Sequence, residues 1–310
     1  MPASNAVQFL IDRLLRRYSP KALWGFATSQ YSTEATCFAL LALRGIFDHA
    51  TLAREVRALV NSCRPDGFWP AVDRDTGPGV WATAIAVNTL VELSPGNRAL
   101  RSGIHALLDA SPQEAHWLYC LKFSTVDTHV RFDPKKYGWG WVPGTLSWVI
   151  PTAMALMALE RSRNLDLVPA KDLERRLDLG YAMLFDRMCP GGGWNAGNSV
   201  VYDVALAPHI DASALALAAL RKHSRNPDVQ RSLSWLVSAN CSSAYSLAWK
   251  ILALRSYLDI QPRFRAITEA AREQLIGILE DPAQSTETTT VALAILALKD
   301  DLNPFALEPA

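Results

Sequence analysis

An internal repeat constrains the fold of this 310-residue chain more than any other feature of its sequence. The repeated unit is a small or hydroxylic residue followed by a run of alanines and leucines. Its six copies cover residues 36–43, 83–90, 152–159, 213–220, 247–254 and 291–298. Each copy is apolar nearly all round, which is typical of a helix buried on every side, and alanine and leucine are strong helix formers. The repeat therefore predicts six buried helices.

A more amphipathic helix is expected before each buried one. These stretches cover residues 5–18, 53–63, 98–109, 171–188, 229–239 and 263–279, and each carries charge on one face. Six outer and six inner helices predict an all-α fold, an α6/α6 toroid, with residues 1–310 forming a single domain. An open solenoid of six helix pairs is the alternative. We favour the closed ring because neither end of the repeat array carries a polar cap for the inner helices.

Composition excludes several classes of protein. Half of the residues are hydrophobic and the formal net charge is +1, so there is no electrostatic reason to expect nucleic acid. The N-terminal stretch is an amphipathic helix interrupted by charge rather than a signal peptide, and no apolar run is long enough to span a bilayer. Five scattered cysteines without a CxxC pair suit reduced thiols, which predicts a cytoplasmic protein. Peripheral contact with a membrane is compatible with these features.

Glycine–tryptophan turns separate outer from inner helices in the first four repeats. Their tryptophans are Trp24, Trp69, Trp139 and Trp194. Glycine supplies the backbone freedom for a turn, and a tryptophan can stack over a helix end. We interpret these four tryptophans as structural.

Together these features resemble the terpene cyclase and prenyltransferase superfamily, which includes squalene–hopene cyclase, over roughly residues 20 to 300. GGWNAGN at residues 192–198 is similar to the family's GGWNxGN turn, and residues 141–145 and 147–153 resemble motifs of small bacterial members built from one toroid. The resemblance implies a helical toroid and an isoprenoid substrate. Classical class II cyclases place the active site between two toroids. A single toroid would therefore be a monodomain cyclase, a partner subunit, or a relative with different chemistry.

Candidate site residues share one level of the predicted ring. Aligning the six inner helices places one residue of each two positions before the one equivalent to Thr36: Glu34, Trp81, Ile150, Asp211, Tyr245 and Thr289. In a closed ring these side chains would lie near the N-termini of the inner helices. Glu34 and Asp211 belong to repeats one and four, so they would lie opposite each other.

Asp211 is the residue that the resemblance implies as the catalytic acid. The string PHIDASA at residues 208–214 is similar to the Asp-x-Asp-Asp-Thr-Ala motif of class II cyclases, whose central Asp protonates an alkene or an epoxide. His209 stands at the first Asp and Ala212 at the following one, so His209 would polarise Asp211 or stabilise its anion. The alternative is that Asp211 only caps its helix, and that His209 is structural. Glu34 has a similar alternative, because residues 32–34 also look like a helix start.

The chemistry expected of this level is acid-initiated cyclisation. Burial would keep a carboxyl group protonated until it acts, and the helix N-terminus would stabilise the anion left behind. Aromatic faces would stabilise the carbocation. The substrate-binding residues predicted in addition to the acids are Trp81, Trp141, Trp148, Ile150, Tyr245 and Thr289.

A second pair of acids, Asp73 and Asp75, lies in the loop that enters the second inner helix. An oxygen-rich loop could hold Mg²⁺ if the substrate carries a diphosphate, and a solvated turn is the alternative. No other cofactor and no resident metal are predicted. The zinc site that resemblance to protein prenyltransferases would imply needs an Asp, a Cys and a His, but no Asp-x-Cys occurs here and no His follows His223.

Two functions remain open from the sequence. One is a class II-like monodomain cyclase that protonates a polyprenyl or meroterpenoid chain. The other is a non-catalytic toroid that binds an isoprenoid or a protein, or a partner subunit of an isoprenoid-processing enzyme. An enzyme predicts a closed apolar chamber with Asp211 pointing into it, whereas a scaffold predicts a filled barrel or an open groove.

Overall fold

The computed structural model describes residues 3–19, 23–25, 31–72, 77–127, 129–281, 287–300 and 303–308. The repeated segments form buried inner helices. These are α2 (Thr33–Leu43), α4 (Val80–Leu93), α7 (Val149–Ser162), α9 (Ile210–Ala219), α11 (Ala244–Arg255) and α13 (Thr288–Leu298). The prediction of six buried helices is confirmed.

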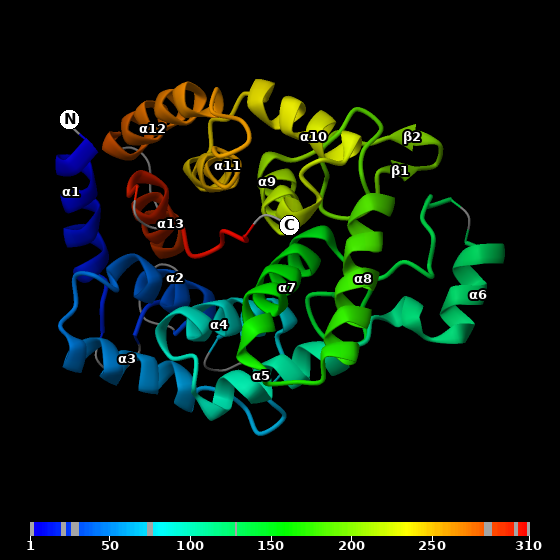
Figure 1. The fold of residues 1–310 in the computed structure, drawn as a ribbon, viewed down its shortest axis with the longest axis horizontal. Helices are drawn as coiled ribbons and strands as arrows, with labels where there is room; N and C mark the ends of the chain where they lie inside the picture. Colours follow the sequence, from blue (N-terminus) through cyan, green and yellow to red (C-terminus); the bar gives the residue numbers. More distant parts are fainter. Residues whose placement is uncertain are drawn as a thin grey trace.

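The inner helices form a closed ring. Each of them packs against the next one along the chain, and α13, the last, packs against α2, the first. Figure 1 shows this ring of inner helices with the others outside it. The contact between α13 and α2 excludes the open solenoid.

The outer ring consists of the amphipathic helices expected from the sequence. They are α1 (Ala3–Leu15), α3 (His49–Asn61), α5 (Arg98–Asp109), α8 (Ala170–Asp186), α10 (Pro227–Ser238) and α12 (Phe264–Glu280). Each packs mainly on the inner helix that precedes it, and α1 packs on α13, which adds a second contact between the two ends of the repeat array. The predicted bounds of these helices hold to within a few residues.

Several short elements lie outside the repeat and were not predicted. They are helix α6 (Trp117–Thr125), the 3-10 turns η1 (Gln113–Ala115), η2 (Arg163–Leu165) and η3 (Leu220–His223), and the antiparallel hairpin of β1 (Val200–Val201) and β2 (Val204–Ala205). Helix α6 and the hairpin stand outside the ring in Figure 1. In the part of the chain that the structure describes, no helix is both long and apolar enough to cross a bilayer.

In the first four repeats the glycine–tryptophan turns fasten the outer helix to the following inner one. The backbone N–H of Trp139 donates to Thr152 Oγ1 at 2.9 Å, and its indole Nε1 donates to the carbonyl of Leu107, near the end of α5, at 2.7 Å. A Cβ on Gly138 would lie 2.2 Å from the Thr152 hydroxyl, so only glycine fits this approach. The other three turns make the same pair of bonds, from Trp24 to Thr36 and Leu14, from Trp69 to Thr83 and Leu59, and from Trp194 to Ser213 and Leu184.

All four indoles are almost completely buried, which confirms their structural role. In the fifth repeat Leu247 stands where the earlier repeats have the threonine or serine that bonds to the turn. A different contact links the outer and inner helices there. There Lys250 Nζ donates to the carbonyls of Val237 and Ala239 at 3.2 and 2.8 Å.

Candidate functional site

The turns also show which way the inner helices face. Thr36, Thr83, Thr152 and Ser213 bond to the turns, so they point away from the ring axis. A residue two positions earlier lies about 200° round the helix and therefore faces the axis. We call the end of the ring formed by Glu34, Trp81, Ile150, Asp211, Tyr245 and Thr289 the mouth.

Glu34 is a partly buried, strongly desolvated carboxyl group at the mouth. It is the second residue of α2, and Trp81 Nε1 donates to its Oε2 at 3.1 Å. Burial raises the pKa of Glu34 to about 7; the bond from Trp81 opposes this rise, and the negative charge of Glu287 adds to it. Near neutral pH a large share of Glu34 therefore carries a proton. Ser32 is the residue that caps α2, so Glu34 does not serve as a cap.

Asp211 lies on the opposite side of the ring, at the start of α9. The helix begins at Ile210 and His209 occupies the cap position without a side-chain bond, so the alternative that Asp211 only caps the helix is wrong. The side chain of Asp211 is partly exposed. His209 is exposed, and its backbone N–H donates to the carbonyl of Trp194 at 2.8 Å. Catalytic roles for Asp211 and His209 remain predictions.

Tyr245 connects the two carboxylates electrostatically. Burial is the main cause that raises the pKa of its phenol above the ordinary value, and the negative charges of Glu34 and Asp211 raise it further. Both carboxylates therefore act on one phenol, which makes the mouth a single electrostatic unit.

Aromatic side chains surround Glu34. The rings of Trp81 and Trp141 lie 5.6 Å apart, and the backbone N–H of Val80 donates to the carbonyl of Trp141 at 3.0 Å. The structure therefore brings Trp141 to the mouth, beside Trp81. Trp148 lies instead against the loop at Gly197, 3.3 Å from where a Cβ of that glycine would stand.

Thr289 and Ile150 complete this level of the ring. Ile150 is partly buried, and Thr289 is 3% exposed. Among the described residues the Thr289 hydroxyl has no hydrogen-bond partner. Its oxygen has almost no accessible surface, so it is a buried polar group left unpaired by the described residues.

Apolar side chains fill the ring beneath the mouth. The residues four positions further along the inner helices face the same way. They are Phe38, Ile85, Met154, Leu215, Trp249 and Leu293, and none of them has accessible surface. No space for a water molecule adjoins them, so the closed chamber expected beneath Asp211 is wrong for this structure. The candidate site is the shallow mouth above this layer.

An aromatic cluster that was not predicted closes part of this layer. The ring of Phe305 lies 5.7 Å from that of Phe38 and 4.9 Å from that of Trp249, and the last two rings are 6.0 Å apart. Phe305 follows the last repeat, so no repeat pattern marks it.

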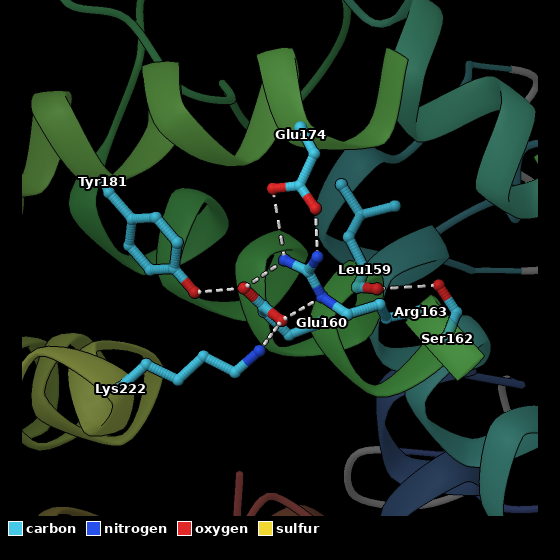
Figure 2. A network of polar contacts seen from close by, with 7 residues as sticks. All are labelled: Leu159, Glu160, Ser162, Arg163, Glu174, Tyr181 and Lys222. Carbon is cyan, nitrogen blue, oxygen red and sulfur yellow. Dashed lines mark hydrogen bonds and ion pairs between the residues drawn. The ribbon is translucent and has the colours of Figure 1, made fainter. Parts of the chain in front are cut away.

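A second polar cluster lies at the opposite end of the inner helices (Figure 2). A cavity of about 540 Å³ adjoins it. Glu160 accepts bonds from Arg163 at 3.0 Å, Lys222 at 2.5 Å and Tyr181 at 2.8 Å, and Arg163 also pairs with Glu174. Burial would raise the pKa of Glu160, but these donors outweigh burial and lower it. Each charge of the cluster in Figure 2 has an opposite partner, so the cluster ties α7, α8 and η3 together.

Asp73 and Asp75 lie outside the described residues. Within the described ranges, no group of three His, Cys, Asp or Glu side chains is arranged to hold a metal ion. A Mg²⁺ site that includes Asp73 and Asp75 stays a prediction.

Solved structures share this architecture. The type II terpene cyclase MstE from Scytonema superimposes with a TM-score of 0.60 at 13% sequence identity, covering 96% of this chain and 97% of that one. The chain has the fold of this type II terpene cyclase. An MstE variant in complex with its substrate, geranylgeranyl dihydroxybenzoate, matches with a TM-score of 0.57 at 15% identity over 96% of each chain.

Solved structures of proteins named for activity on carbohydrates share the fold as well. Cellobiose 2-epimerase from Spirochaeta thermophila matches with a TM-score of 0.61 at 9% identity, over 96% of this chain and 95% of that one. An alpha-amylase from Clostridium perfringens matches with a TM-score of 0.64 at 10% identity, over 94% and 97%. No protein-family model and no curated protein matches the sequence. At these identities the likeness shows the fold alone, and any function depends on the residues at the mouth.

Proposed function

We propose that this chain is a class II-like cyclase that binds the end of a polyprenyl or meroterpenoid chain at the mouth and protonates it with Glu34. One observation carries the proposal: a desolvated carboxyl group with a pKa of about 7 lies at the mouth, bonded to Trp81 and close to Trp141. A strongly perturbed acid with a defined partner is typical of a functional site. Glu34 thereby takes the role first expected of Asp211.

The reaction would begin with the protonated form of Glu34. Its proton adds to the terminal alkene, the alkene's π electrons form the new C–H bond, and a tertiary carbocation results. A neighbouring double bond then attacks this cation and closes a ring, and loss of a proton ends the sequence. The N-terminus of α2 stabilises the Glu34 carboxylate, and the faces of Trp81, Trp141 and Tyr245 stabilise the cation. The Asp211 carboxylate, across the mouth, offers a second stabilising charge.

The filled layer beneath the mouth limits how a substrate would bind. Only the reacting end would reach Glu34, and the rest of the chain would run outward over Trp141, which is 41% exposed. MstE, with its bound geranylgeranyl dihydroxybenzoate, supports an isoprenoid as the first substrate class to test.

The same filled layer favours a second candidate function. A toroid without an inner chamber suits a non-catalytic protein that binds an isoprenoid at its mouth, or a partner subunit of an isoprenoid-processing enzyme. In that case the raised pKa of Glu34 is only a consequence of its burial.

Product analysis by mass spectrometry separates these candidates. Three proteins would be compared: wild type, Glu34→Gln and Asp211→Asn. Each would be incubated with geranylgeranyl diphosphate, farnesyl diphosphate, squalene and geranylgeranyl dihydroxybenzoate. Cellobiose would be included to test for activity on a carbohydrate. We expect an isomeric, more cyclic product from wild type, and a loss of about 10²-fold or more in Glu34→Gln, because general acids contribute at least that much. Asp211→Asn should slow the reaction without abolishing it.

Other outcomes would redirect or overturn the proposal. A product that survives in Glu34→Gln but not in Asp211→Asn would return the acid to Asp211. Turnover of diphosphates that stops with EDTA would support the Mg²⁺ site at Asp73 and Asp75. Binding of the same lipids with no product from wild type would establish the non-catalytic candidate. Circular dichroism would confirm that each variant is folded.

A further inference from the structure

Helix α6 has no buried residue, although most of its side chains are apolar. The β1–β2 hairpin, which bonds to the segment after α6, also exposes apolar side chains. We call this surface the apolar arm; it comprises Trp117, Leu118, Leu121, Val126, Tyr202 and Val204. Over the described ranges, these are the only large apolar side chains more than half exposed; the next, Ile46, is 45% exposed. Isolated exposed apolar residues are ordinary, but a cluster marks an interaction surface.

The arm is one structural unit. The hairpin pairs with the segment that follows α6: the Tyr202 N–H donates to the carbonyl of His129 at 2.7 Å, and the Arg131 N–H to that of Val200 at 3.1 Å. The rings of His129 and Tyr202 are stacked at 4.9 Å. In Figure 1 both parts lie on the same side of the molecule, outside the ring, with the segment after α6 running between them.

The inner side of α6 is anchored by other aromatic residues. Tyr119 and Phe123 stack at 6.5 Å, and Phe123 lies 5.3 Å from Phe132, which in turn lies under the Arg187 guanidinium at 3.9 Å. These contacts hold the helix by one side. The side bearing Trp117, Leu118 and Leu121 is left facing solvent.

The arm belongs to the same end of the ring as the mouth. Both of its parts lie in connections that run from the end of an outer helix to the start of an inner one, α5 to α7 and α8 to α9. The segment before α6 bonds to the loop that enters α7, through the Gln113 N–H and the carbonyl of Thr145 at 3.1 Å. The same loop carries Trp141, which lies over Trp81 at the mouth.

The charge around α6 favours an anionic partner. Between residues 116 and 136 there are four cations, Lys122, Arg131, Lys135 and Lys136, against two carboxylates, Asp127 and Asp133, and the hairpin adds Asp203. Lys136 pairs with Asp133 and Asp186, which leaves Lys122, Arg131 and Lys135 as the exposed cations that could contact a partner. Tryptophan and tyrosine beside lysine and arginine are the residues that suit the boundary between headgroups and acyl chains.

We propose that the apolar arm docks the protein on an anionic lipid surface, with the mouth on the side that faces the membrane. The aliphatic and indole side chains of the arm enter the headgroup region, and the surrounding cations contact the anionic headgroups. This docking does not depend on the chemistry at the mouth, and it requires no transmembrane helix.

Vesicle co-sedimentation tests the proposal. The two kinds of vesicle are phosphatidylcholine alone and phosphatidylcholine with about one third phosphatidylglycerol. We expect wild type to bind the anionic vesicles more strongly, with a blue shift in tryptophan emission. Trp117→Ser combined with Leu121→Ser should weaken binding to both vesicles by about tenfold or more, because two apolar side chains no longer enter the lipid. Lys122→Gln and Arg131→Gln should each weaken binding about fivefold, on anionic vesicles only.

The matched control is Ile46→Ser combined with Ile260→Ser. These residues are 45% and 42% exposed, and both follow the C-terminal ends of inner helices, at the opposite end of the ring from the arm. The control should bind vesicles like wild type. Equal binding by control and arm variants, or no vesicle binding by folded wild type, would overturn the proposal. A dimer of wild type in light scattering that is lost in the arm variant would identify a protein partner instead of lipid.

Discussion

At the scale of single residues, the most specific prediction concerns the ionisation of Glu34 and its effect on stability. Its pKa is about 7 in the folded protein against 4.5 as the ordinary value, so between these pH values the folded state keeps a proton that the unfolded state releases. Stability should therefore fall as pH rises through this window, by about 3 kcal/mol in total. Glu34→Gln cannot ionise and still accepts the bond from Trp81. It should match wild type at pH 4 and be more stable by about that amount at pH 8.

Urea unfolding of both proteins at the two pH values measures the effect. Glu273→Gln, which replaces an exposed carboxylate on α12, is the control for the substitution itself. A constant difference between wild type and Glu34→Gln at both pH values would mean that Glu34 ionises normally, and the proposed acid would lose its support.

The same residue shows what the sequence could and could not predict about the site. The alignment of the repeats placed Glu34, Trp81 and Tyr245 at one level, and the structure brings them together. The raised pKa of Glu34 could not be predicted, because desolvation depends on neighbouring helices and on the Trp141 loop. The motif resemblance favoured Asp211, but Glu34 and Asp211 are both partly buried, and it is Glu34 that accepts the bond from Trp81.

At the scale of elements, the glycine–tryptophan turns are the joints between outer and inner helices. Thr152→Val removes a hydroxyl of almost the same shape and leaves the buried N–H of Trp139 without its partner. We expect a loss of about 1–3 kcal/mol in the free energy of unfolding. Thr89→Val is the matched control, since Thr89 is equally buried, donates to the carbonyl of Ile85 within its own helix and bonds no backbone N–H of a turn. Its loss should be smaller, and equal losses in denaturant unfolding would contradict a special role of the turn.

The elements divide sharply by how well the sequence predicts them. The inner and outer helices follow from local composition and period, so their bounds were found to within a few residues. Helix α6 has neither the repeat nor a buried face, and nothing in its composition distinguishes it from a loop that crosses the surface. An element held by a few aromatic contacts and exposed on its other side leaves no periodic pattern.

At the scale of the whole molecule, ring closure depends on contacts between the ends of the repeat array. The segment 303–308 adds a tie across the ring: Phe305 packs on Phe38 of α2 and Trp249 of α11, and Asn303 Nδ2 donates to the carbonyl of Leu252 of α11 at 3.0 Å. This segment therefore joins the first inner helix to the fifth, on either side of α13. No repeat marks it, so its part in closure was not predicted.

Phe305→Ala tests this tie, because Phe305 is 1% exposed and the change leaves a cavity among aromatic rings. We expect a loss of about 3–5 kcal/mol and a fall in Tm of roughly 10 °C in calorimetry. Phe9→Ala, on the outer surface of α1 and 42% exposed, is the control and should change stability by less than about 0.5 kcal/mol. If Phe305→Ala were as stable as the control, segment 303–308 would be an accessory of the ring, and closure would depend on the α13–α2 and α1–α13 contacts alone.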